Sequence, residues 1–480
     1  MDGLMDYADG VDVEDLEYGY GQEEDIDDYE YDADDSPFND EGFSFQETVE
    51  HCVLPTTNDA IGHIGKLLFW CFVLRIIVTL SSGRTSGMVH LASALIGCLV
   101  LHHFFTDLLV TFVVHAALSY VTLAAVTRLA PRYAGLLVTA VSLTFVLSCE
   151  LWLVEAARWH SVRGAQMILM MKAVSAGLDG SPAAPPPGPL QYAGYLLHPG
   201  TVVFGPWIAL ADYTAAVHTR PAQLASMRWV VTSVGSLVLG LVFMTVSTCW
   251  LNWLLPDRLV LISMWIVAYR EALSFRSSHY FVSFVSQAAA NVSGITSAVW
   301  SPSGELLVSR PTAIEAPRSL VEVVVNWNLP MHYWLKTYVF RVARPAGTAA
   351  AVLCTYGASA VLHGLNFQLA AVLLSLGVYT YTEHRLRGQL GDALGLCVLA
   401  RRCAQPCSRH AGAGRWAARA LNLPLALLAA FHLAYLGVVF DGSSAGASGY
   451  HWRHTLDKWE ALGFASHWVA AGSLVVTWLL

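Results

Sequence analysis

The sequence predicts an all-α protein that crosses a membrane many times. Of its 480 residues, 55% are hydrophobic and only 13% are charged, whereas a soluble domain carries about 25% charged residues. Several apolar runs exceed the roughly 18 residues that mark a membrane-spanning helix. Because such runs recur along the chain, we expect about 10–11 transmembrane helices, with interfacial or re-entrant helices between them.

The N-terminal segment differs sharply in composition from the rest. Of the 36 acidic residues in the chain, 20 lie within residues 1–50, where there is no Lys or Arg. The remainder therefore holds 16 acidic residues against 27 basic ones. We predict that residues 1–48 form a disordered cytoplasmic or lumenal tail, because this composition cannot bury a core. We predict that residues 60–480 form the membrane domain. No nucleic-acid partner is expected.

In the first half of the membrane domain, regular spans are predicted to alternate with broken segments. Gln166–Ala176 is rich in Met but too short to span, which indicates an interfacial or re-entrant helix. Tyr192–Leu210 is apolar but interrupted by Pro and Gly, which is tolerated at membrane depth only where protein or a cavity satisfies the backbone. The spans expected here are Lys66–Leu80, Met88–Phe105, Leu108–Val126, Ala134–Glu155 and Trp229–Leu255.

The second half contains the longest uncharged stretch and the most basic loop. Residues 347–381 include no Asp, Glu, Lys or Arg, and apolar spans follow at Leu421–Phe440 and Phe464–Leu480. The Arg385–Arg419 loop carries seven Arg and should face the cytosol by the positive-inside rule. The nine cysteines are scattered, and most should act as small hydrophobic residues. Cys403 and Cys407 allow metal binding or pairing, but an ordinary basic loop is favoured and no metal is expected.

His363 is the candidate functional residue of the uncharged stretch. An ionisable side chain within a membrane segment is costly and is usually functional. Helical spacing places Thr355, Ser359, His363 and Asn366 on one face, where they form a polar stripe. This stripe should face protein or a water-filled cavity. A histidine that only packs against a neighbouring helix is the alternative explanation.

The pairing of this histidine with an asparagine resembles a known family. Asn328 lies in the segment WNLPMHYW and His363 follows thirty-five residues later in SAVLHG, a pair similar to the Asn and His of the membrane-bound O-acyltransferases (MBOAT). The resemblance extends from about Phe69 to the C-terminus and implies an MBOAT-like fold. It is also carried by QMILMMKAVSAGLD, GTVVFGPWIALADY, FRSSHYFVSF, LHGLNFQLAAVLLSL and KWEALGFASHW.

The resemblance implies transfer of an acyl group from acyl-CoA to a hydroxyl. His363 would be the general base. Asn328 would either stabilise the carbonyl oxygen or orient the hydroxyl. Acyl-CoA enters as a co-substrate, and no cofactor is expected. Candidate residues for binding acyl-CoA or the acceptor are Trp327, Tyr333, Trp334, Lys336, Tyr338, Arg341 and Ser359.

Within the family, the likeness is greatest to the protein-serine acyltransferases of the Wnt pathway. It implies palmitoleoyl-CoA as donor, a serine of a secreted Wnt protein as acceptor, and a multi-pass location in the endoplasmic reticulum membrane among lipids. Two other functions remain open. Acylation of a lipid or sterol uses the same chemistry, and a transporter would also need a buried histidine and broken helices.

Overall fold

The computed structural model describes residues 44–81, 86–180, 185–218, 226–256, 263–295, 306–401, 403, 407, 414–442 and 451–479. Helices and connecting loops make up these residues, with no strand among them, which confirms the all-α prediction. Most of the expected acidic tail lies outside the described residues. Its last residues, Phe45–Thr48, form helix α1, which continues through a π-helical turn into α2 (Leu54–Leu80). Continuous helix is therefore present before residue 60.

Five helical segments of the described chain are long and apolar enough to cross a membrane, or six if the bent pair α21 and α22 forms one span. The number of these segments is smaller than the 10–11 transmembrane helices expected from the sequence. Two physical features of other helices contribute to the difference. Helices α12 and α18 are long enough but carry charged residues, and α17 is apolar but only 15 residues long. The five segments are Phe45–Leu80, Ser86–Leu129, Pro131–Leu153, Met227–Trp250 and Trp416–Gly437.

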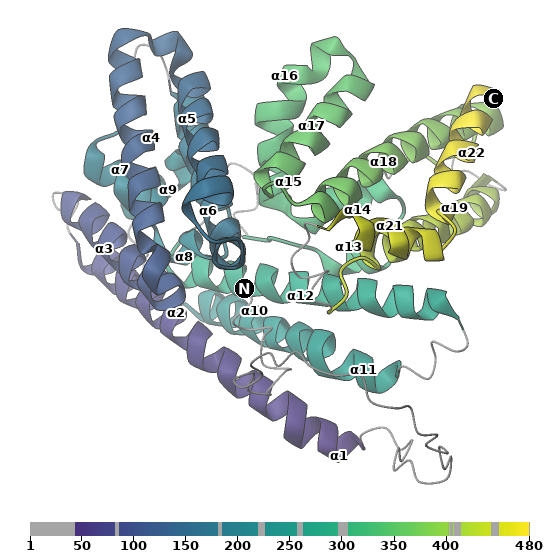
Figure 1. Cartoon of the computed structure of the whole chain (residues 1–480), viewed down its shortest axis with the longest axis horizontal. Helices are drawn as coiled ribbons and strands as arrows, with labels where there is room; N and C mark the ends of the chain where they lie inside the picture. Colours follow the sequence, from purple (N-terminus) through teal and green to yellow (C-terminus); the bar gives the residue numbers. More distant parts are fainter. Residues whose placement is uncertain are drawn as a thin grey trace, which may run out of the picture.

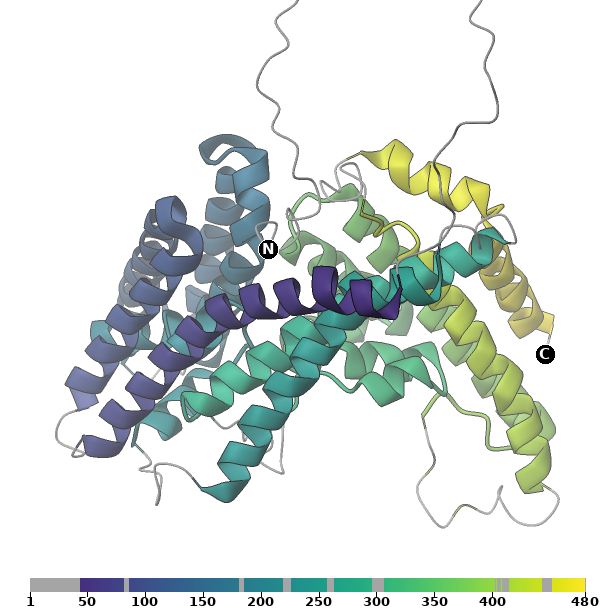
Figure 2. The same cartoon turned by 90° about the horizontal axis from the view of Figure 1, so that it is seen from below.

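Two groups of helices are joined by a long pair that crosses the molecule. Figure 1 shows α3–α9 on one side and α15–α22 on the other, with α10 and α12 running beneath both; Figure 2 shows the same arrangement from below. Helices α10 and α12 pack along each other. The first group comprises α3 (Ser86–Phe105), α4 (Leu109–Leu129), α5 (Ala134–Ser148), α6 (Ala156–Asp179), α7 (Pro189–Leu196), α8 (Pro199–Val202) and α9 (Leu210–His218).

The connecting and second groups follow in the order of the chain. The long pair is α10 (Met227–Thr245) and α12 (Met264–Val292), with α11 (Leu251–Leu254) between them. The second group comprises α13 (Pro311–Glu315), α14 (Leu320–Trp327), α15 (Leu329–Leu335), α16 (Arg341–Ala343), α17 (Thr348–Leu362), α18 (Phe367–Leu394), α19 (Gly414–Gly437), α21 (Trp452–Ala461) and α22 (Ala465–Leu479).

Helix α6 contains Gln166–Ala176, the stretch that was predicted to form an interfacial or re-entrant helix. This stretch belongs to a continuous helix of 24 residues, and all of its residues except Met167 are buried. Gln166 donates to Thr111 Oγ1 at 2.9 Å, and its carbonyl oxygen contacts His115 Nδ1 at 3.0 Å. The helix is buried because α4 and α5 pack against it, a tertiary contact that its composition does not indicate.

The bent segment predicted at Tyr192–Leu210 is confirmed. Helices α7 and α8 break at Leu197 and His198, and a cis peptide bond joins Gly205 to Pro206. The fully buried Lys172 of α6 donates to the carbonyl oxygens of Tyr195 and Leu196 and to Thr201 Oγ1, at 2.7–3.3 Å. Protein groups thus satisfy the carbonyls that this bend leaves without helical partners.

A disulfide joins two segments 197 positions apart in the sequence. Cys52, in the π-helical turn after α1, is bonded to Cys249, in the π-helical turn after α10. The expectation that the cysteines act as small hydrophobic residues is therefore wrong for this pair. Sequence reasoning could not have found it, because no local spacing relates two cysteines so far apart.

A buried ion pair ties α18 to the start of α14. Arg387 is fully buried and binds Glu383 Oε1 at 2.6 Å, while Glu383 Oε2 accepts from the backbone N–H of Leu320 at 2.7 Å. Arg387 also donates to the carbonyl oxygens of Val398 and Arg318. Both charges are therefore paired, and the network holds the α14 N-terminus against α18 and the loop after it.

We expect Arg387→Met to destabilise the protein strongly, because it leaves the Glu383 carboxylate buried without its partner. Breaking a buried pair typically costs about 3–5 kcal/mol. Thermal unfolding of the detergent-purified protein measures the effect. Arg385→Met is the matched control, since Arg385 is exposed on the same helix. Equal melting temperatures for the two variants would contradict the structural role of the pair.

Candidate active site

Asn328 stands at a break between two short helices. It separates α14 from α15 with φ −145° and ψ 95°, and Pro330 follows near the start of α15. Its Oδ1 accepts a hydrogen bond from the N–H of Met331 at 3.0 Å, so Asn328 is the N-cap of α15. The amide nitrogen therefore points away from the cap. Among the described residues it has no hydrogen-bond partner, so its two donors are available to a substrate.

His363 ends α17 and corrects the predicted stripe. The helix stops at Leu362, and Gly364 adopts φ +84°, which favours glycine. Asn366 lies beyond this turn and caps α18 by accepting from the N–H of Leu369 at 2.8 Å. The predicted stripe therefore continues to His363 but is wrong for Asn366. Within the described chain neither ring nitrogen of His363 makes a hydrogen bond, which leaves both available for proton transfer.

A carboxylate missed by sequence reasoning supports the His363 turn. Glu150, in the π-helical turn after α5, accepts a hydrogen bond from the N–H of Leu365 at 2.9 Å. A Cβ at Gly364 would lie 2.6 Å from Glu150 Oε1 and 3.0 Å from Arg163 Cδ. Only glycine therefore allows this close approach. Arg163 is also near enough to interact electrostatically with His363.

His279, also missed, links the two predicted catalytic residues. Its Nε2 lies 2.8 Å from the carbonyl oxygen of Trp327 and must donate to it, and its ring stacks on the Trp327 indole at 4.3 Å between centroids. Trp327 directly precedes Asn328. His279 also interacts electrostatically with His363, and α15 contacts α17. The structure thus brings the segments of Asn328 and His363 to a common region beside α12.

We expect His279→Phe to lower kcat about tenfold and to lower the melting temperature measurably. The phenyl ring keeps the stacking on Trp327 but leaves its carbonyl oxygen without a donor, and such a loss costs about 1–3 kcal/mol. His279→Gln is the matched control, because its amide can donate from a similar position. The role assigned to His279 is wrong if the Gln variant is as slow as the Phe variant.

The predicted aromatic residues fall into two places. Tyr333 stacks on Trp207 with centroids 6.1 Å apart, and Tyr338 meets both Trp207 and Trp334 edge-on or tilted. Trp334 donates to the carbonyl oxygen of Met171 at 3.1 Å, and Tyr338 to Asp179 Oδ2 at 2.7 Å. These three side chains form one wall between α15 and α6. Trp327 is separate from this wall and packs beside His279.

Trp207 is a further residue that sequence reasoning missed. It is buried at the end of the bent segment, and its Nε1 donates to Ser175 Oγ at 3.1 Å. The Pro and Gly breaks predicted a bend in the core, but not that the bend presents an indole to Tyr333 and Tyr338. The resulting apolar wall is suited to contact with an acyl chain.

The predicted polar residues differ in exposure. Lys336 and Arg341 are exposed, whereas Ser359 is buried and its carbonyl oxygen accepts from the N–H of His363 at 3.2 Å. Lys336 acts electrostatically on His332, and so does Arg401 from the loop after α18. The basic group near α15 therefore includes Arg401, which was not predicted. Such a group can bind phosphates.

The arrangement can support acyl transfer to a hydroxyl. It provides an imidazole with open nitrogens, an amide with open donors, an apolar aromatic wall and nearby cations. These are the groups required for proton transfer, for stabilising a developing oxyanion, and for holding an acyl chain and phosphates. The passage that would join both membrane faces at His363 stays a prediction.

Comparison with known proteins gives consistent matches over this region. The profile of "MBOAT, membrane-bound O-acyltransferase family" matches residues 96–382, which include Asn328 and His363. The chain is 41% identical to the protein-serine O-palmitoleoyltransferase porcupine of Mus musculus, over 89% of this chain and 96% of the relative. It is 31% identical to that of Drosophila melanogaster, covering 90% and 86%. Lysophospholipid acyltransferase 2 of Arabidopsis thaliana is 22% identical over 48% of this chain and 59% of its own length.

Proposed function

The chain belongs to the membrane-bound O-acyltransferase family and is an acyltransferase, and on this premise we propose that it transfers a palmitoleoyl group from CoA to a serine of a secreted Wnt protein. The single observation that carries the proposal is the 41% identity to a protein-serine O-palmitoleoyltransferase over nearly the whole of both chains. The availability of the His363 and Asn328 polar groups near a common region supports the chemistry.

The proposed reaction is a direct transfer. His363 accepts the proton of the serine hydroxyl as its oxygen attacks the thioester carbonyl carbon, forming a C–O bond. Asn328 donates from its amide to the carbonyl oxygen, where negative charge develops. The tetrahedral intermediate then collapses, the C–S bond breaks, and the imidazolium returns the proton to the CoA thiolate. The serine ester and free CoA leave, and His363 is neutral again.

The acyl donor is proposed to lie along α15. The wall of Tyr333, Trp334 and Tyr338, together with Trp207, would contact the acyl chain. Lys336 and Arg401 would meet the CoA phosphates. CoA is a cytosolic metabolite with several negative charges, so its site should open where basic residues gather. Arg341 is exposed one turn beyond Lys336 and would extend this basic group.

The acceptor is proposed to arrive from the opposite compartment, the lumen of the endoplasmic reticulum. Disulfides persist in oxidising compartments, so the Cys52–Cys249 bond supports a lumenal position for the turn after α10. The seven Arg between residues 385 and 419, which lie at the end of α18, in the loop after it and at the start of α19, favour the cytosol for that part of the chain. A secreted protein and a cytosolic donor would then reach one catalytic site from two sides.

The test is acyl transfer by purified protein from labelled palmitoleoyl-CoA to a disulfide-bonded peptide that carries a candidate Wnt serine. The matched control peptide carries Ala in place of that serine. Hydroxylamine-sensitive label on the serine peptide alone supports the proposal. Label only in co-purified lysophospholipid would instead indicate lipid acylation, the activity named for the distant Arabidopsis relative. A panel of donors of different chain length then tests the preference for palmitoleate.

A further inference from the structure

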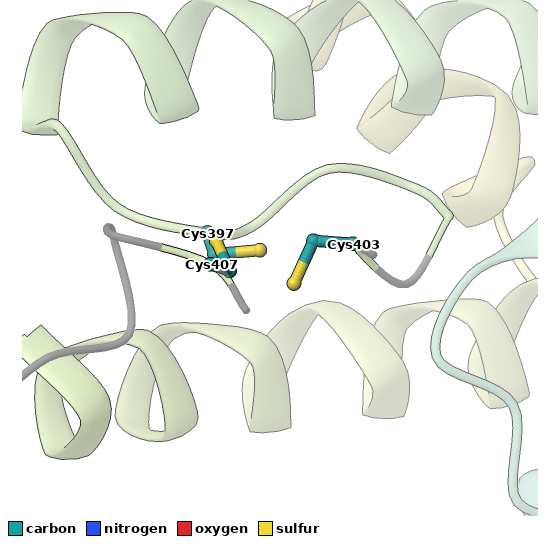
Figure 3. Close-up of side chains that lie close together, drawn as sticks. All are labelled: Cys397, Cys403 and Cys407. Carbon is teal, nitrogen blue, oxygen red and sulfur yellow. The ribbon is translucent and has the colours of Figure 1, made fainter. Parts of the chain in front are cut away.

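Three cysteines gather in the basic loop between α18 and α19. The sulfur atoms of Cys397, Cys403 and Cys407 all lie within 4.8 Å of one another, and the structure holds these residues as thiols. Figure 3 shows the three side chains converging between two helices. The sequence favoured an ordinary basic loop because Cys403 and Cys407 lacked a second ligand pair. Cys397, which follows α18, is the residue that alters this expectation.

The loop that carries Cys397 is fixed by hydrogen bonds from the residues that precede α14 and from α19. The Cys397 carbonyl oxygen accepts from Arg318 Nη2 at 2.9 Å and from Asn422 Nδ2 at 3.2 Å. Arg318 Nε donates to the carbonyl oxygen of Leu399, and Ser319 Oγ to that of Ala400, at 2.8–2.9 Å. Cys397 is therefore a buried, anchored sulfur, to which the later residues Cys403 and Cys407 are brought back.

Clustered thiols have two common fates, and the compartment decides between them. Disulfides form in the oxidising lumen, whereas reduced cysteines in the cytosol more often bind a metal. The chain already contains a disulfide elsewhere, at Cys52 and Cys249. The loop after α18 and the helix ends beside it instead carry seven Arg and are expected to face the cytosol. Its position thus favours metal binding over pairing.

We propose that Cys397, Cys403 and Cys407 bind a structural Zn²⁺ ion. Thiolates are soft ligands that select zinc among the common divalent ions of the cytosol. Tetrahedral zinc with Zn–S bonds of about 2.3 Å holds its sulfurs about 3.8 Å apart, so a small contraction of the cluster completes the site. The three thiols lose their protons on binding. A water or another side chain takes the fourth position. His410 lies outside the described residues and is not part of the proposal.

The ion would stabilise the loop that packs against the start of α14, on one side of the active site. It closes the loop on Cys397, whose neighbours bind Arg318 and Ser319 at the start of α14. Asn328 directly follows the end of that helix. The ion would have a structural role, because its three cysteine ligands belong to this loop and not to the site of His363. Its removal should therefore lower stability first.

The first test is zinc content. Full-length protein purified in detergent without chelators should contain about one zinc per chain by mass spectrometry, as one closed site requires. Cys403→Ser should lose most of this zinc. Cys354→Ser is the matched control and should retain it, because Cys354 is exposed on α17. Zinc retained by both variants would overturn the proposal.

The second test needs no variant. Titration of wild-type protein with a mercurial should release zinc as three thiols react, and Co²⁺ added afterwards with reducing agent should give the visible bands of a tetrahedral cobalt–thiolate site. The melting temperature should fall on release and recover on reconstitution. Absence of zinc together with absence of the cobalt bands would overturn the proposal. So would a disulfide within the cluster in protein isolated from cells with its thiols blocked at lysis.

Discussion

Replacing His363 by alanine should abolish measurable acyl transfer while leaving the protein folded. The imidazole has open ring nitrogens at a tight turn and no other hydrogen bond to lose within the described chain. Removing a general base costs about two to four orders of magnitude in rate. Turnover of labelled palmitoleoyl-CoA on the serine peptide is the measurement, with melting temperature and binding of a non-hydrolysable acyl-CoA recorded in parallel.

The matched control for this variant is His102→Ala, since His102 is exposed on α3. It should retain normal turnover. Thermal stability matters because a packing histidine was the alternative explanation for His363. A large fall in melting temperature with turnover reduced only in proportion to the folded fraction would support packing, and near-normal turnover would remove His363 from the mechanism.

The break at Asn328 has a signal in the local sequence. Proline has no backbone N–H and clashes with the carbonyl four residues earlier, so a helix cannot continue regularly through it, and Pro330 indeed stands near the start of a new helix that Asn328 caps. The bend at Tyr192–Leu210 was predictable for a similar reason. In both cases one or two residues restrict the backbone directly, so no knowledge of distant contacts is needed.

The end of α17 was misjudged although its signal was local. Gly364 directly follows His363, and a glycine after an apolar helical stretch often marks the helix end. Asn366 two positions later is a suitable N-cap for the next helix. The prediction instead gave weight to the four-residue spacing of Thr355, Ser359 and His363. Because the region is largely apolar, the turn signals at Gly364 and Asn366 received too little weight.

Other parts of the site depend on contacts between distant segments. His279, Glu150 and Trp207 belong to helices or bends far from Asn328 and His363 in sequence, and their roles are set by helix packing. The same holds for Cys397, which lies in a plain apolar stretch of the sequence. Residue type and spacing cannot reveal such partners when no local motif relates them, so the supporting residues emerge only from the fold.

The second large effect should come from Asn328, and the structure separates its two functions. Its Oδ1 caps α15 through Met331, whereas its amide nitrogen is open. Asn328→Ala removes both functions, but Asn328→Ser keeps a good N-cap and removes only the amide donors. If the amide stabilises the oxyanion, both variants should lose about a hundred- to a thousandfold in kcat. Recovery of turnover in the Ser variant would show that capping, not donation, is the role of Asn328.

Combining Asn328→Ser with His363→Ala tests whether the two residues act as one site. Once the base is absent, the oxyanion no longer forms by the same route, and loss of its donor should cost little more. The double variant should therefore be about as slow as His363→Ala alone, a strong departure from additivity. Acyl-CoA binding, measured separately, should stay unchanged in all three variants. Rate losses that multiply fully would mean that Asn328 and His363 contribute independently, and would contradict a shared role around the transferred acyl group.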